Sequence, residues 1–119
     1  MCRMIGAICE KEIEPREVLV DGDNAFTYQS LEHPDGWGLV YYKDKLPLVK
    51  KSIVPAIIDL KFRSACFDSK SKLFIGHIRR ATTGSVELSN NHPFVFENWS
   101  FGHNGQISNF LDKLSLIHI

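Results

Sequence analysis

The sequence predicts an α+β protein in which β-sheet predominates. Short segments rich in β-branched and aromatic residues follow one another with turn signals between them, whereas few segments show helical spacing. Strands in succession, rather than strands that alternate with helices, are typical of this class. The 119 residues suffice for one domain, and 44% hydrophobic with 24% charged residues is the composition of an ordinary globular chain.

The first half of the chain is predicted to contribute three strands and a polar loop. Residues 2–9 are predicted as a strand, and we expect it to lie centrally in a sheet because both of its faces are apolar or small. Residues 10–24 are polar and include a proline and an Asp-Gly turn signal, so we expect a loop, with or without a short helix. Residues 37–42 and 46–52 are predicted to pair as a hairpin across three polar residues.

The second half is predicted to add helices and further strands. A proline followed by apolar groups at near-helical spacing predicts a helix over 56–66. Residues 73–78 form the next predicted strand, and 82–93 form a long polar loop. Residues 94–102 are predicted as strand with a turn at the centre, and a serine cap predicts a last helix from residue 109 onward.

Charge and cysteine content exclude several classes of function. The 14 basic and 14 acidic residues give no net charge, and no basic cluster indicates a nucleic acid or an anionic membrane as partner. No apolar run approaches the ~18 residues of a membrane span, and none resembles a signal peptide. Cys2, Cys9 and Cys66 have neither disulfide nor zinc spacing, which favours a reducing compartment, and we expect a cytoplasmic protein.

The histidines show no pair at the spacing of metal ligands, so we expect no metal site. His77 and His103 are expected to be hydrogen-bonded within strands. His92 precedes Pro93 and is expected to fix the polar loop.

Cys2 is the first candidate for chemistry. If Met1 is removed, Cys2 carries both a thiol and a free α-amino group. The amine has a pKa of about 7.7–8.0, close to the pH at which a general base is most effective. An amine beside a thiol can activate that thiol as a nucleophile. The alternative is a small buried side chain, which is the usual role of a free cysteine.

Three polar segments beside strands are candidates for a site. Residues 35–38 place glycines on both sides of Trp37, which permits either a tight turn or a close approach of another group. Arg79 and Arg80 must point to opposite faces, so one can meet a carboxylate inside, unless the pair is exposed or forms a structural salt bridge. The Asn-Gly pair at 104–105 could donate two hydrogen bonds to an oxyanion or form a hairpin turn.

Together and in order, these segments resemble the small stand-alone class II glutamine amidotransferases of the N-terminal nucleophile hydrolase superfamily. The matching segments are Met1–Arg3, His33–Gly38, Gly76–Arg79, Leu88–Phe94 and Phe101–Gln106. The resemblance implies an αββα sandwich of two antiparallel sheets flanked by helices, incomplete in this chain. It also implies an amide hydrolase of the glutaminase or γ-glutamyl amidohydrolase type that needs no cofactor.

The resemblance further implies roles for individual residues. Cys2 would be the nucleophile, its α-amino group the base, and a γ-glutamyl thioester the intermediate. Asn104 and Gly105 match the oxyanion-hole pair. The substrate, glutamine or a γ-glutamyl compound, would be bound by Arg79 through its α-carboxylate, with Thr82, Trp37 and Asn90 nearby. A synthetase or another subunit could receive the ammonia.

The chain departs from the family pattern at its C-terminal end. The family places an acidic residue well beyond the Asn-Gly pair on the substrate's α-ammonium group, but only fourteen residues follow Gly105, and Asp112 is too close. We expect residues 1–113 to be the N-terminal part of an amidotransferase domain and 114–119 to be a tail outside the natural fold. The alternative function is a non-catalytic binding or structural module.

Overall fold

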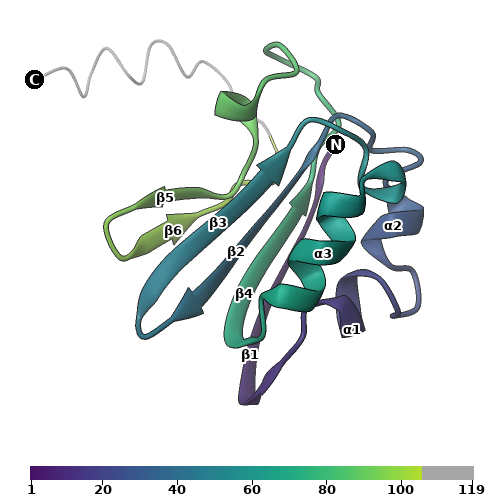
Figure 1. The fold of residues 1–119 in the computed structure, drawn as a ribbon. Helices are drawn as coiled ribbons and strands as arrows, with labels where there is room; N and C mark the ends of the chain where they lie inside the picture. Colours follow the sequence, from purple (N-terminus) through teal and green to yellow (C-terminus); the bar gives the residue numbers. More distant parts are fainter. Residues whose placement is uncertain (106–119) are drawn as a thin grey trace, which may run out of the picture.

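The computed structural model describes residues 1–105, which form two antiparallel sheets with helices packed on the larger one (Figure 1). The larger sheet has the order β1-β4-β2-β3. Its strands are β1 (Arg3–Ile13), β2 (Trp37–Lys43), β3 (Leu46–Ser52) and β4 (Ser71–Ile78). The second sheet pairs β5 (Phe94–Phe96) with β6 (Trp99–Phe101). This arrangement confirms the predicted α+β class, and two antiparallel sheets are consistent with a sandwich of the predicted type.

The helices cover one face of the larger sheet (Figure 1). They are α1 (Arg16–Leu19), α2 (Phe26–Gln29), a 3₁₀ turn at Ala56–Ile58 and α3 (Leu60–Asp68). A second 3₁₀ turn, Leu88–Asn90, lies in the loop after β4. Side chains from these helices and from alternate strand positions form the core, which includes Leu19, Phe26, Leu39, Phe62, Phe74 and Ile78. Because successive side chains of a strand point to opposite faces, the remaining strand positions face the other side of the sheet, away from the helices.

That second face carries a row of four paired residues across the sheet. Met4 pairs with His77, His77 with Gly38, and Gly38 with Lys51. Paired residues on neighbouring strands point to the same face. The β5–β6 hairpin is joined to this face through Tyr42, whose hydroxyl lies 2.8 Å from the Ser100 hydroxyl.

Two expectations about the strands and helices need correction. Within residues 1–105, β1 lies at the edge of its sheet and not centrally, because it pairs with β4 on one side and with no strand on the other. Its Ile8 side chain is 88% exposed. The predicted helix over 56–66 is divided into a 3₁₀ turn and α3. Asp59 causes this division, since its extended backbone ends the turn and its Oδ1 accepts the Lys61 N–H at 2.9 Å as the cap of α3.

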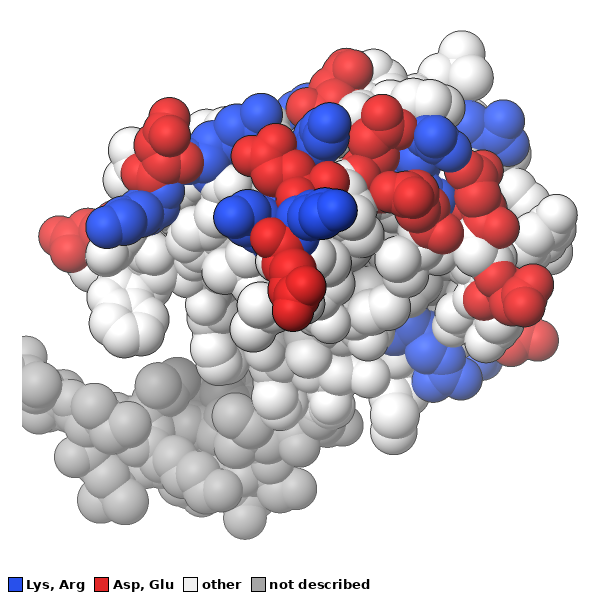
Figure 2. Space-filling view, turned by 90° about the horizontal axis from the view of Figure 1, so that it is seen from below, with Lys and Arg blue, Asp and Glu red and all other residues white. Residues whose placement is uncertain are grey.

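The remaining predicted elements have mixed outcomes. The hairpin of β2 and β3, the strand β4 and the hairpin of β5 and β6 are confirmed, and a short helix, α1, does lie in the polar segment after β1. The predicted last helix and the tail at 114–119 lie outside the described residues. Within residues 1–105, no helix is long and apolar enough to cross a membrane. Basic and acidic side chains are intermixed on the face shown in Figure 2, which fits the balanced charge.

Candidate active site

A polar cavity of about 230 Å³ lies where β1 begins and β4 ends. Five of the seven predicted site residues line it: Cys2, Arg79, Thr82, Asn90 and Gly105. The other lining residues are Arg80, Ala81, Thr83, His92, Phe94 and His103. These residues lie just before β1, between the end of β4 and the start of β5, and after β6, so the cavity depends on three distant parts of the chain.

Cys2 is placed at this cavity by the pairing of β1 with β4. Arg3 pairs with Ile78, so Cys2 precedes the ladder on one strand at the point where Arg79 and Arg80 follow it on the other. The Arg80 N–H donates to the Cys2 Sγ at 3.4 Å, and the same sulfur lies 3.7 Å from the Arg80 carbonyl oxygen. The thiol is free and partly buried. The strand end therefore holds a cysteine sulfur beside the backbone of the arginine pair.

Arg79 and Arg80 point to opposite environments, as the sequence predicts for neighbours at a strand end. Arg79 is only 6% exposed, whereas Arg80 is exposed. The Arg79 guanidinium donates from Nη1 to the Ser85 carbonyl at 2.7 Å and from Nη2 to the Thr83 carbonyl at 3.1 Å. Backbone carbonyls of the following loop thus orient this buried cation.

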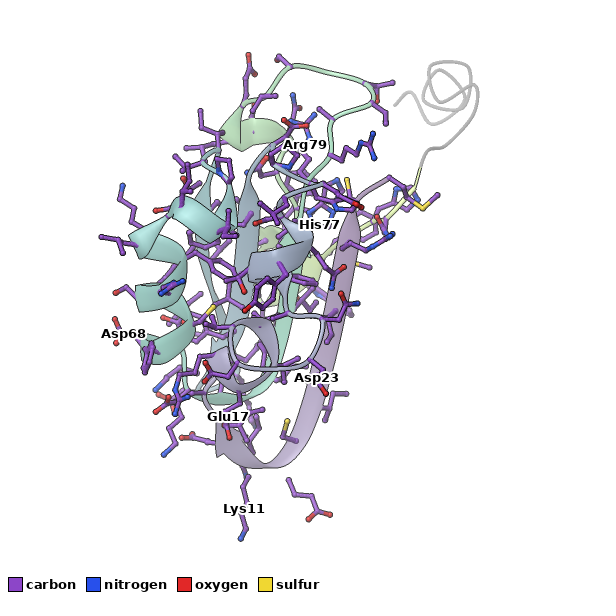
Figure 3. All side chains as sticks on the ribbon, turned by 90° about the vertical axis from the view of Figure 1, so that its right-hand side faces the viewer. Lys11, Glu17, Asp23, Asp68, His77 and Arg79 are labelled. Atoms are coloured by element: carbon purple, nitrogen blue, oxygen red, sulfur yellow. The ribbon has the colours of Figure 1, made fainter. Side chains whose placement is uncertain are left out.

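The loop after β4 is fixed around Arg79 by further hydrogen bonds. The Asn90 side chain donates to the Ser85 carbonyl at 2.9 Å, so Asn90 and Arg79 share one acceptor residue. At the start of the loop, Asp35 accepts the Ala81 N–H through its carboxylate at 2.7 Å. Arg79 and His77 lie at the end of the sheet beside this loop, whereas Lys11 and Glu17 lie toward the other end (Figure 3).

Only one of the two predicted oxyanion-hole residues lines the cavity. Gly105 lines the cavity, and its φ of +144° is a conformation that glycine adopts readily. Asn104 is exposed and is not among the lining residues.

Trp37 does not line the cavity, so the expectation that it contacts the substrate is corrected. Its side chain is 2% exposed, donates from Nε1 to the Asp59 carboxylate at 2.8 Å and packs edge-on against Phe62. An indole buried in a core needs such an acceptor for its N–H. The role of the tryptophan here is to join β2 to the start of α3.

The glycines beside Trp37 do permit a close approach, but the approaching group is the chain's own segment 91–93. A Cβ atom on Gly38 would lie 1.9 Å from the His92 carbonyl oxygen. Gly36 has a φ of +117°, and a Cβ there would lie 2.6 Å from the Asn91 side-chain nitrogen. The two glycines therefore allow the end of the long loop to lie directly on β2.

Histidines beside the cavity are the feature that the sequence did not identify as functional. His77 is 1% exposed, and neither ring nitrogen has a hydrogen-bond partner among the described residues, so the expectation that it is bonded within its strand was wrong. Burial lowers the pKa of His77 to about 4, with smaller contributions from His92, Arg79 and Lys51. His92 stacks on His77 with ring centroids 5.0 Å apart. The signal available in sequence was the position of His92 in a polar loop before a proline.

Within residues 1–105, no group of three or more His, Cys, Asp and Glu side chains is arranged to hold a metal ion. The groups that line the cavity include a thiol, a buried guanidinium, two imidazoles and two threonine hydroxyls.

Comparison with known proteins relates this chain to glutamine amidotransferases. Residues 1–118 match the family model described as glutamine amidotransferases class-II. A protein of Methanocaldococcus jannaschii whose name states no function is 33% identical over 94% of this chain and 32% of its own length. A protein of Escherichia coli named as a glutamine amidotransferase is 34% identical over 66% of this chain and 32% of its own length.

A more distant relative carries a more specific name. The glutamine–fructose-6-phosphate aminotransferase of Francisella tularensis is 27% identical over 94% of this chain, which corresponds to 18% of that protein. The chain spans about a third of the length of the first two relatives.

Proposed function

Because the chain belongs to the class II glutamine amidotransferases, we propose that it hydrolyses the side-chain amide of glutamine or of a γ-glutamyl compound, with Cys2 as an N-terminal nucleophile. The observation that carries this proposal is that Cys2, Arg79 and Gly105 line one cavity although they are far apart in the sequence. A thiol, a buried guanidinium and a backbone donor are the groups that attack on an amino-acid amide requires.

The reaction begins with removal of Met1. The freed α-amino group of Cys2 accepts the thiol proton, and the thiolate attacks the amide carbon to form a tetrahedral oxyanion. Collapse of this intermediate breaks the C–N bond, and the α-ammonium group protonates the departing ammonia or amine. Water then attacks the γ-glutamyl thioester and releases glutamate and the free thiol.

Two donors are assigned to the oxyanion in this proposal. The Gly105 N–H belongs to a residue that already lines the cavity. Asn104 is the adjacent residue and is exposed, so its side-chain amide has to turn toward Cys2 to act as the second donor. Such donors act on charge that develops during the reaction, and loss of one typically lowers turnover by ~10²–10³.

Arg79 is assigned to the substrate's α-carboxylate. Its burial excludes competing water, and the loop carbonyls that orient it leave other guanidinium N–H groups for a planar anion. Thr82 and Asn90 line the same cavity and are assigned as neighbouring contacts. A chain that releases the ammonia into solvent acts as a hydrolase. A chain that passes the ammonia to a second subunit acts as an ammonia donor.

Replacement of Cys2 tests the proposal. Cys2→Ala is expected to abolish release of ammonia from glutamine and of amine from γ-glutamyl compounds, because the nucleophile is lost. Cys9→Ala is the matched control, since Cys9 is also partly buried and lies on β1, which follows Cys2, but does not line the cavity. Intact mass should show that active protein lacks Met1. Activity that survives in Cys2→Ala, or in protein that retains Met1, would refute the mechanism.

A second candidate is a non-catalytic binding module. It is favoured by three aromatic side chains on the β5–β6 hairpin, Phe96, Trp99 and Phe101, which are 74%, 73% and 61% exposed. A glutamine-like electrophile distinguishes the two candidates, because an enzyme is modified at Cys2 and a binding module is not.

A further inference from the structure

His92, a lining residue of the cavity with no role assigned so far, contacts the segment that carries the proposed oxyanion donors. The Nδ1 atom of His92 accepts a hydrogen bond from the backbone N–H of His103 at 3.0 Å. His103 adjoins Asn104 and stands two residues before Gly105. The His92 ring is therefore joined to the short segment that has to present both donors to the substrate.

His92 is itself held in place by the sheet. Its ring packs at a tilt against the rings of His77 and Phe94, with centroids 5.0 Å and 4.5 Å away. Its backbone lies against Gly38, where no side chain other than hydrogen fits.

The residue before it is fixed from two further strand positions. The Asn91 side chain donates to the Ser52 carbonyl at 2.9 Å, and the Lys51 ammonium donates to the Asn91 carbonyl at 2.6 Å. The larger sheet thus supplies a rigid base for the His92 acceptor, which is the kind of support that a precise donor position requires.

The hydrogen bond also defines the protonation state of the ring. Nδ1 can accept only when it carries no proton, so a neutral His92 carries its proton on Nε2. Burial lowers the pKa of His92, and the groups that face it, His103, Lys51 and Arg79, lower it further. His77, stacked on the same ring, is likewise kept neutral by burial. The acceptor is therefore present at neutral pH.

We propose that His92 is a positioning residue that holds the oxyanion donors of Asn104 and Gly105 in place through the His103 N–H. This inference rests on the proposed function and extends it to a residue with no assigned role there. A donor acts fully only when it is held at the oxyanion before the reaction, and small displacements of reacting groups are costly. Loss of the acceptor is expected to lower kcat more than it raises KM, because Arg79 retains the substrate.

Two variants of His92 separate its acceptor from its packing. His92→Phe keeps an aromatic ring between His77 and Phe94 but removes the acceptor, and it should lower kcat by about tenfold or more with KM within about twofold. His92→Asn places an amide oxygen close to the position of Nδ1 and should restore most of kcat. If His92→Phe fails to fold, His92→Gln, whose oxygen lies one bond further out, serves as the variant with a misplaced acceptor.

A second measurement does not depend on activity. Hydrogen exchange of the His103 amide, followed by NMR in the full chain, should accelerate in His92→Phe and return toward the wild-type rate in His92→Asn. The Val40 amide in β2 is the control and should exchange equally in all three proteins.

The outcomes separate this inference from the proposed function. An active wild type whose kcat is unchanged by His92→Phe, or is not rescued by His92→Asn, would overturn the positioning role alone. Unchanged exchange of the His103 amide would show that the contact is absent. A wild type that releases no ammonia or amine would refute the proposed function and the catalytic part of the inference, whereas the exchange data would still report the contact.

Discussion

Arg79 is the buried cation of the candidate site. Its guanidinium is held by two loop carbonyls, so its remaining donors point in fixed directions. A guanidinium can bind a carboxylate through two parallel hydrogen bonds, which an ammonium cannot reproduce. Substrate affinity is therefore expected to depend on the shape of this side chain as well as on its charge.

Arg79→Lys is predicted to raise KM for glutamine or a γ-glutamyl substrate by about 10–100-fold, because hydrogen bonds to a charged partner contribute ~1.5–3 kcal/mol each. kcat should change less than KM, since Cys2 and Gly105 are unaltered. Steady-state kinetics measure both constants. Arg63→Lys on the exposed face of α3 is the control and should leave them unchanged. An unaltered KM in Arg79→Lys would remove Arg79 from the substrate site.

At the scale of secondary structure, β2 supports the site through a position with no side chain. Gly38 lies opposite His77 in the sheet, and the absence of a Cβ atom leaves the space that the His92 backbone occupies. A larger residue would force apart β2 and the segment that carries His92. The fold of the sheet and the geometry of the cavity are therefore coupled at this glycine.

Gly38→Ala is predicted to destabilise the chain by at least about 2–3 kcal/mol, because the added methyl group meets a backbone oxygen that cannot move aside freely. Gly6→Ala is the matched control in β1, where nothing lies within 4 Å of the added carbon. A strand alanine is then expected to be neutral or slightly stabilising. Urea unfolding compares the two variants with the wild type, and equal stability of both would contradict the close packing at Gly38.

The elements that sequence patterns predicted are those with local signals. The hairpin of β2 and β3 is encoded by aromatic and β-branched residues on both sides of a short polar turn, and the adjacent arginines are separated by strand alternation alone. The links that sequence did not predict join distant residues. Trp37 meets Asp59, and His92 meets the His103 N–H, only because the tertiary fold brings them together. The resemblance implies a place in the pocket for Trp37, whereas the fold buries this side chain against α3.

At the scale of the molecule, residues 1–105 place α1, α2 and α3 on one face of the larger sheet and the segments that form the cavity at the end of that sheet (Figure 1). His77 lies within the sheet, on the face opposite the helices, with His92 stacked on it. Both rings are neutral at neutral pH because burial lowers the pKa of each. Acid should therefore act on the fold and on the candidate site through the same pair of side chains.

The free energy of unfolding is predicted to fall as the pH is lowered from about 6.5 toward 4. An unfolded histidine has a pKa near 6.5, whereas that of folded His77 is about 4. Between these values the unfolded chain binds more protons than the folded chain, so protonation favours unfolding. The loss from His77 should approach about 3 kcal/mol at the acid end and be absent above pH 7.

Urea unfolding of the full chain between pH 7.5 and pH 4.5 measures this dependence. His77→Phe keeps a buried ring without a titrating group, so its stability should fall less steeply over that range. The comparison uses the slope with pH rather than the absolute stability, because the substitution can also change packing. His92 contributes in the same direction, so a residual slope is expected in His77→Phe and a smaller one when His92→Asn is added. An identical slope in wild type and His77→Phe would show that His77 is not held neutral by the fold.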